Sequence, residues 1–287
     1  MSRIVYVNGR YVPYGDAAIH AEDRGFQFAD SVYEVIEVLD SRLVDAPRHM
    51  ARLDRSLSEL GIAQPMSRAA LGQVIARTIY LNRVRHGTVY LQVSRGAGPR
   101  DFALPAEGTP PTLVVIARSQ SQTKIEVLAQ SGIAVVTMPD IRWGRSDIKT
   151  VMLLPACLAK DAAKSQGARE AWLVDGEGHV TEGASSNAWI ITGDKRLVTR
   201  PLSNRILAGV TRATTIDTAK AQGFGFQERA FTVAEAHQAA EAFITSATNT
   251  VMPVVRIDGV AIGNGRPGPL TMSLRARFHD VAVISGK

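Results

Sequence analysis

The chain has 287 residues, of which 45% are hydrophobic and 21% are charged, a composition typical of a globular protein that excludes a disordered chain. Its net charge of +6 comes from scattered basic residues, so a mildly basic surface is favoured over nucleic-acid binding and would suit anionic ligands. The single cysteine excludes an intrachain disulfide and favours a reducing, cytoplasmic compartment, and no apolar stretch is long enough to predict a signal peptide or a membrane span.

The first part of the chain predicts hairpins and two helices. Asn8-Gly9 lies between two β-rich runs within Ile4 to Val12, which is the signature of a type I′ hairpin turn. Residues 31–39 are rich in Val, Ile and Tyr and predict a strand. Asp45 is placed to cap a helix whose apolar residues recur at helical spacing until Gly61. Further elements are predicted as a helix from about residue 67 and strands at 88–94 and 112–117.

A long loop and a short polar segment follow. Residues 95–110 contain several glycines and prolines and no periodic pattern, and loops of this length inside compact domains are often functional. Residues 119–122 read Ser-Gln-Ser-Gln and predict a linker. We therefore expect an N-terminal α+β domain at 1–118 and a C-terminal α+β domain at 123–287.

The second part mixes strands and helices. Strands are predicted at 133–137, 171–174, 188–191 and 243–246, and helices at about 152–164, 210–222 and 270–283. This order favours an α+β fold over a doubly wound one, and no Gly-x-Gly-x-x-Gly follows a strand to support a dinucleotide site.

Lys149 is the candidate reactive residue. It lies just before the apolar run Val151 to Leu154, where we expect a loop to lead into a helix beside a buried face. Loss of hydration there would lower the pKa of an ammonium group, and such lysines form Schiff bases with carbonyl compounds, including pyridoxal phosphate (PLP). The ordinary alternative for a single lysine is a solvated side chain at a helix start. A second stretch, Thr181-Glu182-Gly183-Ala184-Ser185-Ser186-Asn187, argues against that alternative.

Together these two stretches resemble the fold-type IV PLP enzymes, and most closely the D-amino-acid aminotransferases among them. The resemblance extends from about residue 4 to 280 in one unbroken order. It includes Asp147-Ile-Lys, His49-x-x-Arg52-Leu, Gly209-Val-Thr-Arg and Phe26-Gln-Phe-Ala-Asp-Ser-Val-Tyr-Glu34. The motifs are modest singly, and together they indicate the fold and the cofactor more strongly than the substrate. The resemblance implies a two-domain α+β fold with PLP between the domains, and a homodimer.

The resemblance also implies cofactor-binding roles. Lys149 would carry the aldehyde of PLP and move the Cα proton of the substrate, and Glu182 would face the pyridine nitrogen, so that the ring can absorb electrons. The phosphate would be held by Arg52, by the amides of Val210 and Thr211 at a helix start, and by the turn at Ser246 and Ala247. Leu207 would pack against the ring. No metal site is predicted.

Substrate recognition is implied at Tyr33, at Arg100 in the 95–105 loop, and at His49 near Arg52. A guanidinium is a natural bidentate ligand for a substrate carboxylate. The family pattern has a histidine two residues after this arginine, whereas this chain has Phe102. One hydrogen-bond donor to the carboxylate is therefore missing.

The implied reaction is reversible transfer of an amino group between an amino acid, of D configuration, and a 2-oxo acid. Branched-chain L-amino-acid transaminases, (R)-amine transaminases and aminodeoxychorismate-type lyases share most of the motifs and stay open as alternatives. A PLP-binding module without turnover is a further alternative outside the enzymes.

Overall fold

The structure is a computed structural model that describes residues 3–285. It divides into two compact units, and each is described by itself. The first unit comprises residues 3–121 together with Ile148–Met152 and residues 283–285, and the second comprises Gln122–Asp147 and Leu153–Ala282. The segment around Lys149 thus groups with the first unit, which chain order alone does not indicate. The domain boundaries at 118 and 123 stay a prediction about independent folding.

The first unit is built on an antiparallel sheet in the order β2-β1-β6-β5-β3-β4. Its strands in that order are β2 (Arg10–Pro13), β1 (Ile4–Val7), β6 (Thr112–Ser119), β5 (Gly87–Ser94), β3 (Ser31–Leu39) and β4 (Arg42–Leu43). Val7 pairs with Arg10, so Asn8 and Gly9 form a two-residue turn, and both have positive φ. The predicted type I′ hairpin is therefore confirmed.

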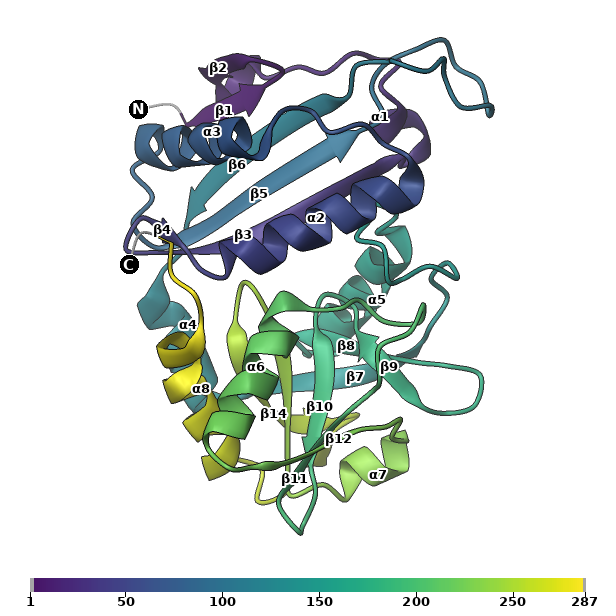
Figure 1. Cartoon of the computed structure of the whole chain (residues 1–287). Coiled ribbons are helices and arrows are strands. Elements are labelled where there is room, and N and C mark those ends of the chain that lie inside the picture. The colour runs from purple at the N-terminus through teal and green to yellow at the C-terminus, as the bar shows by residue number, and fades with distance from the viewer. Residues whose placement is uncertain (1–2, 286–287) are drawn as a thin grey trace. The chain divides into compact units, whose positions relative to one another are not determined.

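Two helices cover one face of this sheet (Figure 1). Helix α2 (Ala46–Leu60) packs against β3, and α3 (Arg68–Leu81) packs against β1 and β6. Along β3, every second residue from Val32 to Val38 is buried, as expected for a strand with one helix-covered face. A short 3-10 helix, η1 (Tyr14–Asp16), and helix α1 (Arg24–Phe28) lie between β2 and β3 in the chain.

The second unit contains a mixed sheet in the order β12-β11-β10-β13-β14-β7-β8-β9, with β15 paired to β14. The strands in chain order are β7 (Ile133–Pro139), β8 (Glu170–Val174), β9 (Val180–Gly183), β10 (Asn187–Ile191), β11 (Arg196–Thr199), β12 (Gly225–Glu228), β13 (Glu241–Ser246), β14 (Thr250–Ile257) and β15 (Val260–Ala261). Pairs β11–β12, β14–β7 and β7–β8 are parallel and the others antiparallel.

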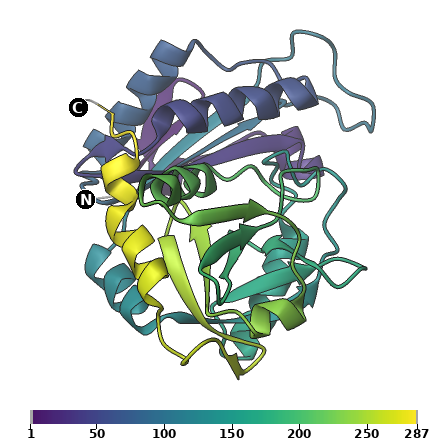
Figure 2. The ribbon, with the colours of Figure 1, turned by 60° about the horizontal axis from the view of Figure 1, so that its bottom comes forward.

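Helices pack on this second sheet. They are α4 (Gln122–Ser131), α5 (Leu154–Ser165), α6 (Val210–Ala221), α7 (Val233–His237) and α8 (Pro269–Val281). Helix α5 lies on β7 and β8 through small alanines, whereas α6 and α8 lie side by side on β13 and β14 (Figure 2). A core of Trp172, Ile190, Phe231 and Ile244 fills the space between the sheet and α4 and α7. The α+β class is confirmed.

Two local expectations are wrong. Asp45 occupies the position before α2, but its side chain forms no cap; its carboxylate accepts a hydrogen bond from the Val283 amide at 2.9 Å. The run after Lys149 is not a buried helical face, because α5 begins only at Leu154 and Met152, Leu153 and Leu154 are all exposed. No helix within residues 3–285 is long and apolar enough to cross a membrane.

Candidate functional site

Lys149 is held at the edge of the first sheet. Its carbonyl accepts a hydrogen bond from the Tyr33 amide at 3.0 Å, and Thr150 forms a β-bridge with Val32. The neighbours Ile148 and Thr150 are buried, at 3% and 6% exposure. The Nζ atom lies 4.1 Å from the centroid of the Tyr33 ring. The backbone is therefore fixed by strand-type pairing, and the amine lies against an aromatic face, a favourable place for a cation.

On the helix-covered face of β3, Glu34 joins two predicted site residues. Arg52 donates from Nε and Nη2 to the two carboxylate oxygens of Glu34, at 2.8 and 2.7 Å. The Nδ1 atom of His49 lies 2.7 Å from Glu34 Oε2. Glu34 is fully buried, and His49 is 3% exposed. The bidentate geometry fixes the plane of the Arg52 guanidinium.

The charge states in this cluster follow from its geometry. Burial alone would raise the pKa of Glu34, but the charge and hydrogen bonds of Arg52, with His49, lower it to about 2. Burial lowers the pKa of His49 below its ordinary value against the raising effect of Glu34, and Arg52 and Lys149 act in the same direction as burial. A neutral His49 beside a carboxylate must carry its proton on Nδ1, because a carboxylate can only accept. Its Nε2 is then an acceptor.

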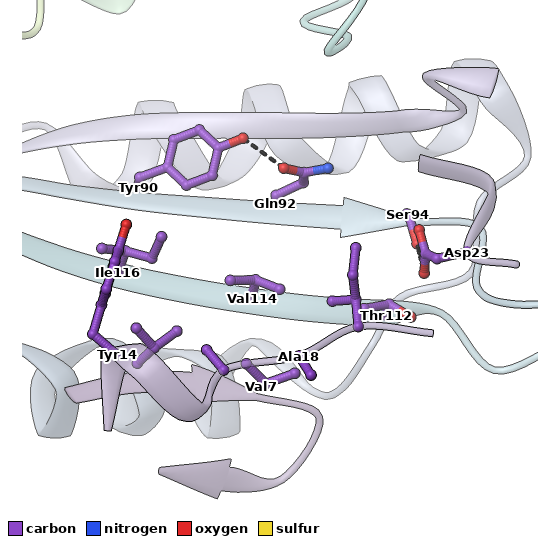
Figure 3. A pocket seen from close by; sticks show the side chains of 13 residues that line it. Val7, Tyr14, Ala18, Asp23, Tyr90, Gln92, Ser94, Thr112, Val114 and Ile116 are labelled. Atoms are coloured by element: carbon purple, nitrogen blue, oxygen red, sulfur yellow. Dashed lines mark hydrogen bonds between the residues drawn. The ribbon is translucent and has the colours of Figure 1, made fainter. Parts of the chain in front are cut away.

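A cavity of about 350 Å³ lies on the opposite face of the sheet (Figure 3). Tyr90 and Gln92 of β5 and Val114 of β6 line it, and Tyr14 closes one side. The Tyr90 hydroxyl donates to Gln92 at 2.7 Å, and burial raises the pKa of Tyr90 to about 12, so this group is a phenol at neutral pH. The ring of Tyr90 lies 5.6 Å from that of Tyr33. A residue that lines the cavity therefore contacts the same ring that the Lys149 amine faces.

Arg100 lies apart from these groups, in the loop between β5 and β6. Its guanidinium lies over the rings of Phe28 and Phe102, with centroid distances of 5.3 and 5.9 Å. Phe102, which replaces the histidine of the family pattern, is 84% exposed. The structure therefore brings together Lys149 with Tyr33 and His49 with Arg52, and it places Arg100 on an aromatic pair.

In the second unit Glu182 is a buried carboxylate with several donors. Asn187 donates from Nδ2 to Glu182 Oε2 at 2.9 Å, and the Leu207 amide lies 3.2 Å from both carboxylate oxygens. Arg142 Nη1 donates to Glu182 Oε1. These hydrogen bonds fix the orientation of the carboxylate and place the predicted residues Glu182 and Leu207 in contact.

Arg142 is shared between two acids. Its Nε and Nη2 atoms donate to Asp140 at 2.9 and 2.8 Å, and Nη2 also reaches the Arg205 carbonyl at 3.1 Å. Burial raises the pKa of Glu182 to about 7, against the lowering effect of Arg142 and the Leu207 amide. Near neutral pH Glu182 is therefore partly protonated, and a further cationic partner would favour its carboxylate form.

Asn187 also connects Glu182 to the start of α6. Its Nδ2 donates to the Leu207 carbonyl at 3.0 Å, and a Cβ on Gly209 would meet its Oδ1 at only 2.0 Å. Gly209 is the N-cap of α6 and no side chain caps this helix. Val210 and Thr211 follow, both buried. An uncapped helix start with a glycine is suited to bind an anion.

The predicted turn at Ser246 and Ala247 begins at the last residue of β13, a strand that packs against α6. Ser246 Oγ lies 3.2 Å from the Thr248 hydroxyl, and the Asn249 amide group contacts both. Both predicted residues are half-buried. Hydroxyl groups in this turn are therefore gathered at one end of β13.

Sequence reasoning missed Glu34, Arg142 and Asn187 as site residues. Glu34 and Asn187 lie within the quoted motifs, whereas Arg142 lies outside them. The contacts of Glu34 with Arg52 and of Arg142 with Glu182 join residues 18 and 40 positions apart in the chain. The available signal was the alternation along β3, which places Glu34 on the buried face, where a charge must be paired. Arg142 offered no comparable pattern.

Comparisons with known proteins agree with this geometry. A model of the family described as Amino-transferase class IV matches residues 31–257. The chain is 39% identical to a D-alanine aminotransferase of Bacillus licheniformis, with 96% of each chain covered. It is 38% identical to that of Listeria innocua over 97% of this chain and 96% of the relative, and 35% identical to that of Staphylococcus haemolyticus over 96% of each.

Solved structures share the fold. The branched-chain aminotransferase of the archaeon Thermoproteus uzoniensis, solved with norvaline, matches with a TM-score of 0.86 at 22% identity, over 99% of each chain. The branched-chain amino acid aminotransferase of Escherichia coli matches with a TM-score of 0.87 at 22% identity, over 98% of this chain and 95% of that one.

The Glu34 cluster predicts an acid-dependent stability. Because its folded pKa of about 2 lies below the ordinary 4.5, Glu34 stabilises the fold above pH 4.5 and loses this effect as the pH falls towards 2. Glu34→Gln should lower the free energy of unfolding at pH 7 by roughly 3–5 kcal/mol, because Arg52 loses its buried counterion. Urea unfolding at pH 7, 5, 4 and 3 should show that the difference in the free energy of unfolding between the wild type and Glu34→Gln becomes smaller as the pH falls. Glu177→Gln, an exposed position, is the control, and a gap independent of pH would contradict the assignment.

Arg142 predicts the titration of Glu182. Removal of the guanidinium in Arg142→Met should raise the pKa of Glu182 further above about 7, since burial and Asp140 then act without opposition from Arg142. The measurement is carbon-13 NMR of glutamate-labelled protein without cofactor, with Glu182→Gln to assign the signal. Arg196→Met, which removes an exposed ion pair with Asp194 in the same unit, should leave this pKa unchanged. A pKa that falls or stays fixed in Arg142→Met would refute the role given to Arg142.

Proposed function

Because the chain belongs to the class IV aminotransferase family, we propose that it uses PLP to transfer an amino group between a D-amino acid and a 2-oxo acid. The observation that carries the D configuration is the identity of 35–39% over nearly the whole chain to enzymes named D-alanine aminotransferases. The two branched-chain enzymes matched by structure are less similar in sequence, at 22% identity, and support the fold.

The donor set of the chain fits PLP. An uncapped, glycine-led helix start and the hydroxyl-bearing turn at Ser246 and Ala247 suit a phosphate, and Arg52 supplies a guanidinium of fixed orientation. The buried carboxylate of Glu182 suits a protonated ring nitrogen. The positive charge of that nitrogen would lower the pKa of Glu182 and favour its anionic form. When bound, PLP supplies an aldehyde that condenses with amines and a ring that absorbs the electron pair released at the substrate Cα.

The residues of the chain would then divide the work. Lys149 Nζ would hold the aldehyde at rest, and as a free amine it would remove and return the proton of the substrate Cα. Glu182 would place a negative charge near the ring nitrogen, and Arg142 and Asn187 hold the orientation of its carboxylate. Leu207 is placed by its amide contact to Glu182, so its side chain can pack beside the ring.

Substrate recognition is assigned to Tyr33 and Arg100, with His49 as a neutral acceptor near Arg52. Arg100 is the cation for the substrate carboxylate, and Phe102 gives apolar surface where the family pattern has a donor. A lost hydrogen bond to a charged group weakens binding by about 1.5–3 kcal/mol, or about ten- to a hundredfold. We therefore expect weak binding of D-amino acids and some tolerance of (R)-amines.

A homodimer in the cytoplasm is part of the same proposal. Leu154 and Leu158 of α5 are 70% and 56% exposed and lie one helical turn apart, an apolar surface that a second copy could cover. The single cysteine supports a reducing compartment.

Lys149→Ala should abolish transamination while the fold is kept, because the variant lacks the amine that strand pairing fixes at the edge of β3. Borohydride reduction followed by peptide mass spectrometry should find the cofactor on Lys149 in the wild type. Lys160→Ala, at a lysine paired with Glu170, is the matched control and should keep turnover. Wild-type turnover in Lys149→Ala, or cofactor trapped on another lysine, would end the assignment.

The substrate assignment predicts a stereochemical preference. The wild type should convert D-alanine or D-glutamate faster than L-leucine, and Arg100→Ala should raise the KM for D-alanine about ten- to a hundredfold through loss of a charged hydrogen bond. The same variant should change the KM for an (R)-amine much less. Conversion of L-leucine but neither D-amino acid would favour the branched-chain alternative instead.

A further inference from the structure

The loop that carries Arg100 has little structure of its own. It connects β5 to β6, and residues 98–111 form only turns and bends. Ordering such a segment costs about 1–2 kcal/mol per residue in backbone entropy. A loop that must hold one side chain in a fixed position therefore needs stabilising contacts with the rest of the unit. Gly96, at the start of the loop, has φ of +100°, and a Cβ there would meet the Pro110 carbonyl oxygen at 2.1 Å. The loop therefore starts from a close backbone approach that only glycine allows.

Asp30 is the common partner of two arginines beside this loop. Its carboxylate accepts from Arg24 Nε at 2.8 Å, and from Arg95 Nε and Nη2 at 2.7 and 3.0 Å. The side chains of the three residues are 7–12% exposed. Burial alone would raise the pKa of Asp30, but the hydrogen bonds from Arg95 and Arg24 hold it below its ordinary value. Asp30 is thus an anion that two cations share.

The two arginines reach the loop at different points. Arg95 starts it and donates to the carbonyls of Leu60 and Gly61 at the end of α2, at 2.7 and 2.9 Å. Arg24 donates from Nη1 to the carbonyls of Asp101 and Ala103, at 2.8 and 3.2 Å. The contacts of Arg95 fix the beginning of the loop, and those of Arg24 fix the residue directly after Arg100.

Arg24 also sets the surface on which Arg100 lies. Its guanidinium packs over the Phe28 ring at 4.6 Å, and that of Arg100 lies over the same ring at 5.3 Å. Two guanidinium groups close to one ring repel each other unless an anion is near, and Asp30 is bonded to the buried one. Loss of the carboxylate would leave Arg24 and Arg95 close together and unneutralised, which is strongly unfavourable for buried charges.

We infer that Asp30 is a positioning residue for substrate binding: through Arg24 and Arg95 it holds the loop in the conformation that presents Arg100 to the carboxylate of the amino donor. This rests on the proposed function for the role of Arg100. Asp30 touches neither reactant and acts through the two arginines. Its loss should weaken binding of carboxylate substrates and free the loop, and leave cofactor retention unchanged.

The test is Asp30→Asn, with Asp40→Asn as the matched control. Asp40 pairs with Arg85 at 3.0 Å on the exposed side of the same unit, so the control removes an ion pair away from the loop. In Asp30→Asn the KM for D-alanine should rise roughly tenfold, since small displacements of a positioning group have effects of this size. The values of kcat and PLP affinity should stay within about twofold of the wild type. Trypsin should cut after Arg100 several times faster than in the wild type, as it does in freed loops. Asp40→Asn should match the wild type in all four measurements.

A double variant separates positioning from a general loss of structure. In an Arg100→Ala background, Asp30→Asn should add less than about twofold to the KM, because the group that it positions is gone. A fully additive effect, or unchanged KM and cleavage in the single variant, would overturn the inference. If Asp30→Asn fails to fold by circular dichroism, Arg24→Lys replaces it. A lysine keeps the charge beside Asp30, but its donors all lie on one nitrogen, whereas Arg24 uses Nε for Asp30 and Nη1 for the two loop carbonyls. The same shifts are therefore expected in smaller measure.

The two proposals fail in different ways. Cleavage by trypsin needs no substrate, so unchanged cleavage in both Asp30→Asn and Arg24→Lys contradicts the positioning role whatever the reaction. A wild type that leaves D-alanine unconverted contradicts the proposed function, even where the variant loops are cut faster.

Discussion

The candidate site depends on buried carboxylates paired with arginine. An ionised carboxylate in a protein interior loses several kcal/mol of hydration, which is recovered only with close, well-oriented donors. Arg52 meets this need for Glu34, Arg142 for Glu182, and Arg24 with Arg95 for Asp30. Except for Arg24 and Asp30, which are six residues apart, each pairing joins residues that are distant in the chain. The requirement that buried charge be neutralised therefore also fixes the positions of the groups proposed to bind cofactor and substrate.

The same kind of pair gives two different charge states. Glu34 accepts hydrogen bonds from Nε and Nη2 of Arg52 and one from His49, and its pKa falls to about 2. Glu182 shares Arg142 with Asp140, and burial raises its pKa to about 7. A permanent anion suits a group that only orients its neighbours. A carboxyl near its titration point responds to its partner, so a protonated ring nitrogen would fix Glu182 as an anion.

Much of the fold could be predicted from local patterns. Strands such as 31–39 and helices such as 210–222 are confirmed. They could be predicted because alternation and helical spacing are patterns of residues that are close together in the sequence. The surroundings of Lys149 were mispredicted, because its apolar run was interpreted as buried and is instead exposed. The β-bridge that holds Lys149 pairs residues 32 and 150, and no local pattern specifies such a partner. Arg142 was missed for the same reason, whereas the alternation along β3 does indicate that Glu34 is buried, although it does not indicate its partners.

Lys149 is proposed to take the proton from the Cα of a D-amino acid, and the proposed transamination depends on this step. The direct test follows deuterium in alanine labelled at Cα, with the purified protein, PLP and a 2-oxo acid acceptor. We expect D-alanine to lose its deuterium to solvent and to react more slowly than the unlabelled compound, while L-alanine keeps its label, and Lys149→Ala should exchange neither. Loss of the label from L-alanine with retention in D-alanine would contradict the account.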